Sequence, residues 1–407
     1  MRHIPDAERR ARLGRRHALA PSARAADPEA ATRAMTVLHS TEPATVFLSC
    51  WARVDGMTVA DVDRALYDDR TLVKQLAMRR TLFVLPRDLL PAVWGSASAR
   101  VAEAELKRMA KDVEKAGLAA DGTRWVLDAR DAILAGLGAR ADGMTAVEVR
   151  ELLPQVAVKF DVTAGSVWNH GRLLTHLGLT AELVRGTNTQ HWRLSRPRWT
   201  LMPDWLGETP PPALPVEEGY AEIVRRWLHT FGPGTEADLV WWLGATKKAV
   251  RDALATLDAV AVSLDGGGTG YVLPGDDGTD DGTDEGEGEG PLEPWVALLP
   301  VLDPTVMGWK ERAWYLGAHG PDLFDRNGNA GTTAWVDGRV VGCWVQDEAG
   351  VVSVHLLEKL PAATRAALDA EAARLTDWLD GTRVGTVYPS PAMRAARDQA
   401  TGGSSAR

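Results

Sequence analysis

The chain has 407 residues, of which 45% are hydrophobic and 25% charged, and its formal net charge is −9. This length predicts two or three domains, and no stretch contains the roughly 18–20 uncharged apolar residues that a membrane helix needs. The basic N-terminus lacks the apolar core of a secretory signal, and two cysteines are too few for a disulfide framework or a cysteine zinc site. We therefore expect a cytoplasmic protein.

The net charge conceals an uneven distribution of charged residues. Eight acids and no base fall within residues 275–290, and without those acids the formal charge is −1. This segment has no apolar side chain to bury, so we predict a disordered acidic insertion. The first forty residues carry eight arginines against four acids. The acidic total therefore does not exclude a basic face that binds nucleic acid.

Residues 1–125 form the first predicted domain, a winged-helix unit with an elaborated beginning. Apolar residues recur at helical spacing here, interrupted by turn-forming residues. A strand ends the unit and a charged helix connects it to the next one. The expected elements are helices over 29–40, 43–54, 57–69 and 71–79, a strand over 80–86 and a connecting helix over 101–117.

Residues 126–206 form the second predicted winged helix. Thr145 precedes an apolar run and is expected to cap its helix. Residues 181–198 contain four Arg and one Glu, so the hairpin of this unit is basic. Such a hairpin is typical of a wing that contacts DNA phosphates. The expected elements are helices over 144–154 and 165–179 and strands over 181–186 and 191–196.

Residues 207–274 contain a proline-rich linker and the third predicted winged helix. Thr235, with Asp238 three positions later, predicts a capping box at the start of the second helix. Three helices followed by a hairpin are the layout of a winged helix-turn-helix, which presents its third helix to a DNA groove. The expected elements are helices over 217–234, 235–244 and 245–258 and strands over 259–264 and 271–274.

Residues 291–393 are predicted to form an α+β domain with an antiparallel sheet. Asp337-Gly338 predicts a tight turn between two strands, and Pro361 predicts the first position of an amphipathic helix. The fold class is therefore mainly α with β: three tandem winged helix-turn-helix units and a C-terminal β-rich domain. The expected elements are strands within 295–309, 332–346 and 351–360, a helix over 361–380 and a flexible tail over 394–407.

One polar patch interrupts the first apolar region, and it contains His39, Thr41 and Glu42. Histidine can orient a water near neutral pH, and a glutamate can act as a base or stabilise a cation. The alternative is an ordinary helix N-cap, with His39 as a polar residue at a helix end. The sequence contains no P-loop, HExxH, CxxC or GxSxG motif, so we expect no metal and no cofactor, and no motif supports a small-molecule enzyme.

Candidate DNA contacts occur in the second predicted unit. Asn169, His170 and Arg172 open its second helix. Asparagine and arginine read base edges, and histidine can reach a phosphate. The alternative is that these side chains form an ordinary solvated face. In the basic hairpin, Arg185 and Arg193 are the candidates for phosphate contacts.

Further candidates occur in the C-terminal domain. Lys310 lies close in sequence to an aromatic pair, and Arg326 and Asn327 belong to a glycine-containing loop over 324–331. Backbone amides and Arg326 in such a loop can clamp a phosphate. The alternative is a sharp turn in which Asn and Gly supply positive φ angles.

Four segments, together with the third predicted winged helix, resemble a known family. They are VLHSTEPATVFLSCWARV (37–54), MRRTLFVLP (78–86), LLPVLDPTVMGWKERAWYL (298–316) and LFDRNGNAGTTAWVDGRVVGCW (323–344). The chain resembles the bacterial tandem winged-helix DNA glycosylases of the AlkZ-like and YcaQ-like kind over residues 10 to 390. The resemblance implies a C-shaped arrangement around duplex DNA. It also implies hydrolysis of the N-glycosidic bond of alkylated purines, in some members unhooking of crosslinks, and no metal or nucleotide.

The chain departs from this family at one place. Characterised members carry Gln-x-Gln or Gln-x-Asp, and the resemblance puts His39 at the first Gln and Thr41 at the second. We expect either a monomeric, nucleoid-associated repair glycosylase acting on alkylated or crosslinked DNA, or a non-catalytic lesion sensor or transcriptional regulator that has lost the pair. Regulators usually bind as dimers, and no dimerising coiled coil is visible, which favours repair.

Overall fold

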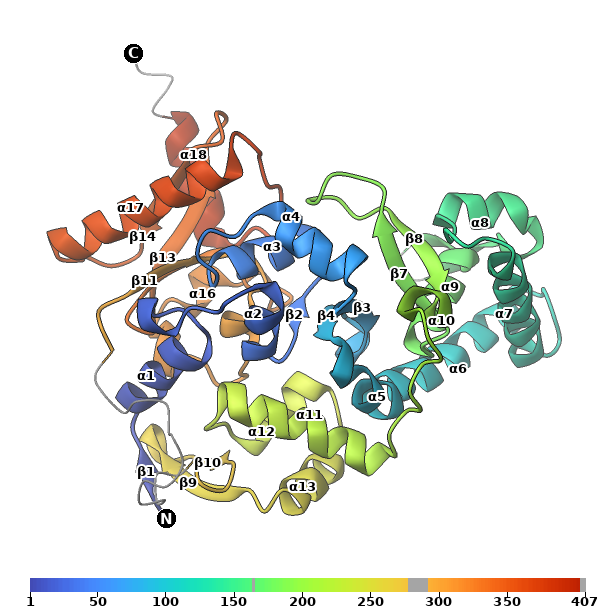
Figure 1. Ribbon diagram of the computed structural model, residues 1–407, viewed down its shortest axis with the longest axis horizontal. Helices are drawn as coiled ribbons and strands as arrows, with labels where there is room; N and C mark the ends of the chain where they lie inside the picture. The colour runs from blue at the N-terminus through green and yellow to red at the C-terminus, as the bar shows by residue number, and fades with distance from the viewer. Residues whose placement is uncertain (163–164, 277–291, 403–407) are drawn as a thin grey trace. The chain divides into compact units, whose positions relative to one another are not determined.

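The chain is described here from a computed structural model that covers residues 1–162, 165–276 and 292–402. Helices and small sheets occur together throughout, which confirms the predicted α+β class (Figure 1). Among these residues, no helix is long and apolar enough to cross a membrane. The predicted acidic insertion lies outside the described residues, apart from Gly275 and Asp276.

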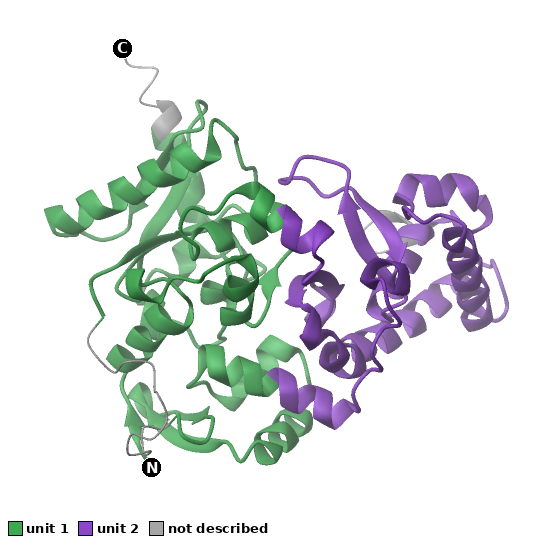
Figure 2. Cartoon of the chain, viewed as in Figure 1, with its two compact units in different colours: residues 1–62, 224–407 green, residues 63–223 purple. Residues whose placement is uncertain are grey.

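The chain divides into two compact units (Figure 2). Unit 1 consists of residues 1–62 and 224–407, and unit 2 consists of residues 63–223. Helices α4 (Val59–Asp63) and α11 (Val216–Phe231) contain the points at which the chain passes from one unit to the other.

Unit 2 has a helical core with short hairpins. Its helices are α5 (Leu90–Val93), α6 (Ala99–Lys115), α7 (Gly122–Gly138), α8 (Ala146–Leu152), α9 (Asn169–Leu179) and α10 (Met202–Leu206). Its strands form three antiparallel pairs: β3 (Leu72–Leu76) with β4 (Leu82–Pro86), β5 (Lys159–Val162) with β6 (Gly165–Trp168), and β7 (Leu183–Asn188) with β8 (Pro197–Leu201).

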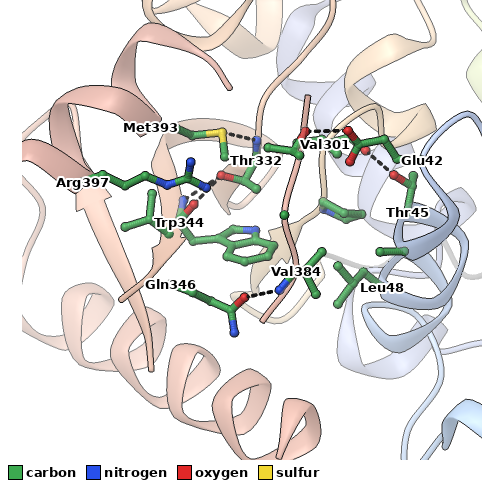
Figure 3. A pocket seen from close by; sticks show the side chains of 15 residues that line it. Glu42, Thr45, Leu48, Val301, Thr332, Trp344, Gln346, Val384, Met393 and Arg397 are labelled. Carbon is green, nitrogen blue, oxygen red and sulfur yellow. Dashed lines mark hydrogen bonds between the residues drawn. The ribbon is translucent and has the colours of Figure 1, made fainter. Parts of the chain in front are cut away.

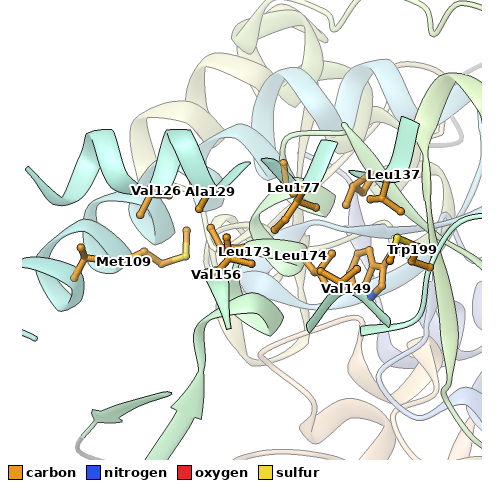
Figure 4. Packing of buried hydrophobic residues seen from close by; sticks show 14 residues of the cluster. Met109, Val126, Ala129, Leu137, Val149, Val156, Leu173, Leu174, Leu177 and Trp199 are labelled. Carbon is orange, nitrogen blue, oxygen red and sulfur yellow. The ribbon is translucent and has the colours of Figure 1, made fainter. Parts of the chain in front are cut away.

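The helices of unit 2 meet in one hydrophobic cluster, shown in Figure 4. Along α7, Val126, Ile133 and Leu137 recur at helical spacing and are buried, which gives the helix one apolar face. Trp199 of β8 packs into the same cluster and so joins the β7–β8 hairpin to the helices. Thr145 caps α8, as predicted, and Glu148 completes a capping box with it.

Three predictions in unit 2 are wrong. The helix expected over 165–179 begins only at Asn169, because residues 165–168 form strand β6, which pairs with β5. Residues 71–79 do not form a helix, because Leu72–Leu76 pair as strand β3 with β4 and tertiary pairing overrides local propensity. The strand expected over 191–196 is instead β8, which begins at Pro197. Asn188 causes this shift, since its side chain bonds the backbone of Gln190, Leu194 and Arg196 and folds the segment into a loop.

Unit 1 begins with short elements around a buried helix. They are β1 (His3–Ile4), α1 (Asp6–Arg16), α2 (Pro28–Ala34), β2 (Leu38–His39) and α3 (Pro43–Trp51). The helix expected over 29–40 ends at Ala34, because Thr36 adopts φ of 61°, which a right-handed helix excludes. Leu38 and His39 then form a strand.

The middle of unit 1 follows the predicted order of three helices and a hairpin. Its elements are α11, α12 (Glu236–Leu243), α13 (Lys247–Thr256), β9 (Val260–Leu264) and β10 (Thr269–Val272). Thr235 and Asp238 form the predicted capping box of α12. Strand β1 pairs with β9 in parallel, and β10 pairs with β9 antiparallel.

The C-terminal part of unit 1 is a four-stranded antiparallel sheet in the order β11–β12–β13–β14, with α17 against β11 and β14 and α18 against β13. Asp337 and Gly338 make the predicted turn, both with positive φ. Its elements are β11 (Val296–Leu299), α14 (Pro304–Met307), α15 (Ala313–Leu316), α16 (Gly320–Leu323), β12 (Thr333–Val336), β13 (Arg339–Gln346), β14 (Val352–Leu356), α17 (Ala362–Leu379) and α18 (Pro391–Gly402).

Three details of this part differ from the expectation. The strand predicted within 295–309 stops at Leu299, because Asp303 caps the short helix α14 with Pro304 at its first position. Pro361 is the N-cap of α17 rather than its first helical residue. Residues 394–402 of the predicted tail belong to α18, which Met393 and Ala396 bury against the domain.

Candidate active site

The patch that contains His39 connects a strand to a helix. His39 ends β2, and α3 begins at Pro43, so residues 40–42 form a short connection. His39 is 9% exposed and Glu42 is 8% exposed, whereas Thr41 is exposed. The prediction that His39 ends a helix is therefore wrong. The N-cap of α3 is Glu42, whose side chain makes no capping bond, so the N-cap alternative for Ser40 or Thr41 is wrong as well.

Glu42 bonds to a segment that is distant in sequence. Its Oε1 accepts hydrogen bonds from Thr386 Oγ1 at 2.8 Å and from the backbone amide of Val387 at 2.7 Å. Burial raises the pKa of Glu42, although both hydrogen bonds act in the opposite direction. The carboxylate thus fastens residues 386–387 to the start of α3.

Glu42 also borders a small pocket within unit 1 (Figure 3). Thr45 and Leu48 of α3 lie on one side of it, and Trp344 of β13 and Val384 lie opposite. The space measures about 20 Å³, which is room for a single water. It is therefore a gap in packing and cannot hold a nucleobase.

A buried ionic network underlies α3. Arg53 donates to both carboxylate oxygens of Asp303, at 2.9 and 2.8 Å, and both side chains are fully buried. Ser49 and the amide of Thr305 donate to the same carboxylate, at 2.7 and 2.9 Å. Burial by itself raises the pKa of Asp303, but the Arg53 charge and these hydrogen bonds outweigh it, and the pKa is lowered. The network holds α3 against α14.

His17 extends this network. Its Nδ1 lies 2.9 Å from Thr305 Oγ1 and its Nε2 lies 3.2 Å from the carbonyl oxygen of Thr230. A carbonyl only accepts, so Nε2 carries the proton and Nδ1 accepts from the Thr305 hydroxyl. Burial, followed by the charge of Arg53, lowers the pKa of His17 to about 3. His17 is therefore neutral at physiological pH.

The residues predicted from the sequence did not include His17, Arg53 or Asp303. A signal was present, because Arg53 and Asp303 each follow an apolar run directly. Charged residues in such positions are rarely buried unless they are paired. The partner of each lies about 250 residues away in the chain, so no local pattern identifies it.

The candidate side chains at the start of α9 are either buried or engaged in an ion pair. Asn169 is fully buried and His170 is 7% exposed. Arg172 forms an ion pair with Asp112 of α6 at 2.6 Å. The alternative of a solvated face is therefore wrong for Asn169 and His170. Neither side chain is placed to reach a base edge in this conformation.

The two arginines of the hairpin differ in their environment. Arg185 lies over the ring of Trp199, with its guanidinium carbon 5.1 Å from the ring centroid. Burial lowers the pKa of Arg185 to about 10. Arg193 is exposed in the loop between β7 and β8. Of these two candidates, only Arg193 presents its charge to solvent.

The candidates in the C-terminal domain lie on the surface of unit 1. Lys310, Arg326 and Asn327 are all exposed. The loop that carries Arg326 is built around Asp325, whose carboxylate accepts from the amides of Asn327 and Asn329 at 2.8 and 2.9 Å. Gly328 adopts φ of 81°, as the turn alternative predicted, whereas Asn327 and Asn329 do not have positive φ angles. The turn leaves the side chains of Arg326 and Asn327 available for a ligand.

Comparison with known proteins identifies the family. A sequence profile described as DNA glycosylase AlkZ-like matches residues 32–378. The chain belongs to the AlkZ-like DNA glycosylase family. Among solved structures, the fold is similar to that of Streptomyces sahachiroi DNA glycosylase AlkZ, with a TM-score of 0.71 and 19% sequence identity. The match covers 94% of this chain and 99% of that one. A search of curated proteins gave no significant match.

The region shared with the AlkZ-like family contains every candidate site residue but not the whole buried network. His39, Thr41 and Glu42 lie near its beginning, and Arg326 and Asn327 lie near its end. Helix α1 and His17 precede it. Among the described residues of this AlkZ-like chain, no group of three or more His, Cys, Asp or Glu side chains is arranged to hold a metal ion.

Proposed function

We propose that this protein is a DNA-repair glycosylase that hydrolyses the N-glycosidic bond of alkylated purines, or of crosslinked bases, in duplex DNA. The observation that carries the proposal is the family match over residues 32–378, which includes the connection between β2 and α3. The enzyme acts as a monomer and needs no cofactor.

The proposed chemistry uses His39 and Thr41. A water oxygen attacks C1′ of the damaged nucleotide, the bond from C1′ to the base nitrogen breaks, and its electron pair leaves with the base. An N7-alkylated guanine carries a positive charge, so it departs as a neutral base. The neutral imidazole of His39 orients the water and accepts its proton. The exposed hydroxyl of Thr41 provides a further hydrogen bond to the water or to the sugar.

Glu42 acts as a positioning residue in this proposal. Its Oε1 already accepts two hydrogen bonds from residues 386–387. Those bonds fix the residue that directly follows Thr41, and so they fix the backbone that presents both catalytic candidates. The role of base therefore falls to His39.

The proposed DNA contacts come from side chains that are exposed. Arg193 in unit 2 and Lys310, Arg326 and Asn327 in unit 1 contact phosphates, which position the duplex without reading its sequence. The β7–β8 hairpin acts as the wing of a winged helix. Arg172 and Arg185 support this surface through their contacts with Asp112 and Trp199.

A second candidate function is that of a non-catalytic DNA-binding protein, such as a lesion sensor or a regulator. The observation that favours it is the sequence His39-Ser40-Thr41 itself. This sequence lacks the carboxamide and carboxylate groups of the Gln-x-Gln and Gln-x-Asp pairs that it replaces.

Replacement of His39 separates the two functions. The glycosylase proposal expects His39→Ala to lower single-turnover excision from a duplex with one 7-methylguanine by about 10²–10⁴-fold, the usual contribution of a positioned acid–base group. Duplex affinity and melting temperature should change little. The control is Thr41→Ser, which keeps the hydroxyl and should keep most of the activity. Excision by His39→Ala at the wild-type rate would contradict the assignment of His39.

A further inference from the structure

An open cleft of about 650 Å³ lies in unit 1, apart from the region of His39. Its walls are α12, the first residue of α13, strand β10 with the preceding Gly268, and residues 310–311. Clefts of about 300–1,000 Å³ are typical of sites for small ligands. The space is large enough for a single nucleotide and too small for a duplex.

Hydrogen bonds fix the walls of the cleft to α12 and to the residue before its N-cap. The amide of Tyr271 donates to the carbonyl oxygen of Gly234 at 2.8 Å, which holds β10 beside the start of α12. Asp238 of α12 accepts from the amides of Lys310 and Glu311 at 2.8 and 2.9 Å. The side chains that face the cleft therefore project from a rigid frame.

The charged groups of the cleft are mostly free. Lys247, Lys310 and Glu311 are exposed, and none of their side chains has an ion-pair or hydrogen-bond partner among the described residues. Glu236 is neutralised by Arg251, at 2.7 Å. The cleft thus presents two ammonium groups and one carboxylate, a combination that suits an anion which also carries a hydrogen-bond donor.

Two aromatic side chains complete the lining. Trp241 and Tyr271 are only partly buried, whereas the neighbouring Trp242 is 5% exposed and belongs to the core. The guanidinium carbon of Arg312 lies 4.7 Å from the Trp241 ring centroid. Aromatic rings beside cationic side chains are the common means of binding unpaired nucleotides, because every base has a flat face that stacks.

We propose that this cleft binds one nucleotide of single-stranded DNA, with the phosphate at Lys247 and Lys310 and the base against Tyr271 and Trp241. The inference rests on the proposed function in taking DNA as the partner. It adds a site for an unpaired strand, which shares Lys310 with the proposed duplex contacts. A base must be unstacked from its neighbours to enter the cleft. The ligand is therefore a single strand, such as one that flanks a lesion.

Fluorescence anisotropy of a labelled 15-nucleotide thymidine strand tests the inference. Lys247→Gln should weaken binding several-fold and reduce the slope of log K against log salt by about 0.7, the value for one phosphate contact on a single strand. The matched control is Lys248→Gln on the same helix, since Lys248 bonds Asp252 at 2.5 Å and does not line the cleft. This control should bind as the wild type does.

Stacking is tested at Tyr271. Tyr271→Ala should weaken binding by about five-fold or more, since a stacked base contributes about 1–3 kcal/mol, and Tyr271→Phe should retain wild-type affinity. Equal affinities of Lys247→Gln and Lys248→Gln, or unchanged binding by Tyr271→Ala, would overturn the inference. Binding of thymidine monophosphate without binding of the strand would overturn it too.

Excision by the wild type is measured on the same preparation. Excision from duplex DNA without single-strand binding removes the inference and leaves the proposed function intact. Single-strand binding that depends on Lys247 and Tyr271, without excision from any alkylated duplex, supports the inference and contradicts the proposed glycosylase function.

Discussion

At the scale of a single residue, variants of Glu42 distinguish a positioning role from a role as a catalytic base. Both of its hydrogen bonds are accepted by Oε1, and an amide oxygen at the same place can accept the same two bonds. Glu42→Gln should therefore retain wild-type excision within a few-fold. Glu42→Ala leaves the amide of Val387 without its partner and should lower both activity and melting temperature. Single-turnover excision and thermal unfolding of the two variants provide the measurement, and loss of activity in Glu42→Gln with normal stability would make Glu42 a base.

His17 makes stability depend on pH. Its pKa is about 3 in the folded chain, because of burial, and ordinarily near 6.5 when exposed. Below about pH 6.5, the unfolded chain binds a proton at His17 that the folded chain does not bind. The contribution of this residue to stability is therefore full above pH 6.5 and decreases as the pH falls towards 3, by up to about 1.4 kcal/mol per pH unit.

The variant His17→Gln isolates this effect. Glutamine can donate to Thr230 and accept from Thr305 but does not titrate. Urea unfolding between pH 7 and pH 4.5 should show a shallower loss of free energy of unfolding in the variant than in the wild type. Identical pH dependence of the two proteins would contradict the assignment of a buried neutral imidazole.

At the scale of elements, α6 and α7 approach so closely that their contact requires a glycine. A Cβ at Gly122 would lie 2.0 Å from the carbonyl oxygen of Ala110, whereas a Cβ at Gly138, at the other end of α7, meets nothing within 4 Å. Gly122→Ala should destabilise the protein by about 1–3 kcal/mol, as overpacking usually does. Gly138→Ala should be neutral or slightly stabilising. Chemical denaturation checks both, and equal stabilities would contradict this packing.

We expect substitutions of the two candidate arginines in the β7–β8 hairpin to have different effects. Arg193 is exposed, so Arg193→Gln should weaken duplex binding and reduce the salt slope by about 0.9 for one phosphate contact, without loss of stability. Arg185 packs on Trp199, so Arg185→Gln should lower the melting temperature. Binding titrations at several salt concentrations test this difference. If Arg193→Gln binds the duplex with the same dependence on salt as the wild type, Arg193 does not contact a phosphate and the proposal that the hairpin binds DNA is contradicted.

Elements whose signals are local could be predicted from the sequence. The helix cap at Thr145, the capping box at Thr235 and the turn at Asp337-Gly338 depend on residues three positions apart or fewer, and all three are present. The local sequence of strand β3 predicts a helix, because local propensity does not reflect the pairing of this segment with β4 in the folded chain. The positive φ of Thr36, which ends α2 early, is likewise imposed by its surroundings.

In the candidate site, too, local features could be predicted from the sequence but long-range contacts could not. The sequence identified the polar residues between β2 and α3, because they interrupt an apolar region. It did not identify the contact of Glu42 with residues 386–387, which joins positions more than 340 residues apart. Nor did it show that Asn169 is buried, because a polar residue type gives no indication of burial when its neighbours come from other helices.

At the scale of the whole molecule, the chain has an AlkZ-like fold, and we propose that His39 and Thr41 form an altered version of the family's catalytic pair. Charge alone does not decide its partner, because most of the acidic excess is concentrated in residues 275–290. The central claim is that the altered pair still supports hydrolysis of a glycosidic bond. Duplex binding alone cannot test this claim, since a lesion sensor would bind as well.

The most direct test is single-turnover release of 7-methylguanine from a defined duplex by an excess of wild-type protein. We expect free 7-methylguanine and an abasic site in an unbroken strand. The rate should fall at acidic pH, where the imidazole is protonated and cannot accept a proton from water. The same preparation should bind the duplex more weakly as salt increases. Salt-dependent binding with no base release above the spontaneous rate at any pH would contradict the account and identify the protein as a non-catalytic DNA binder.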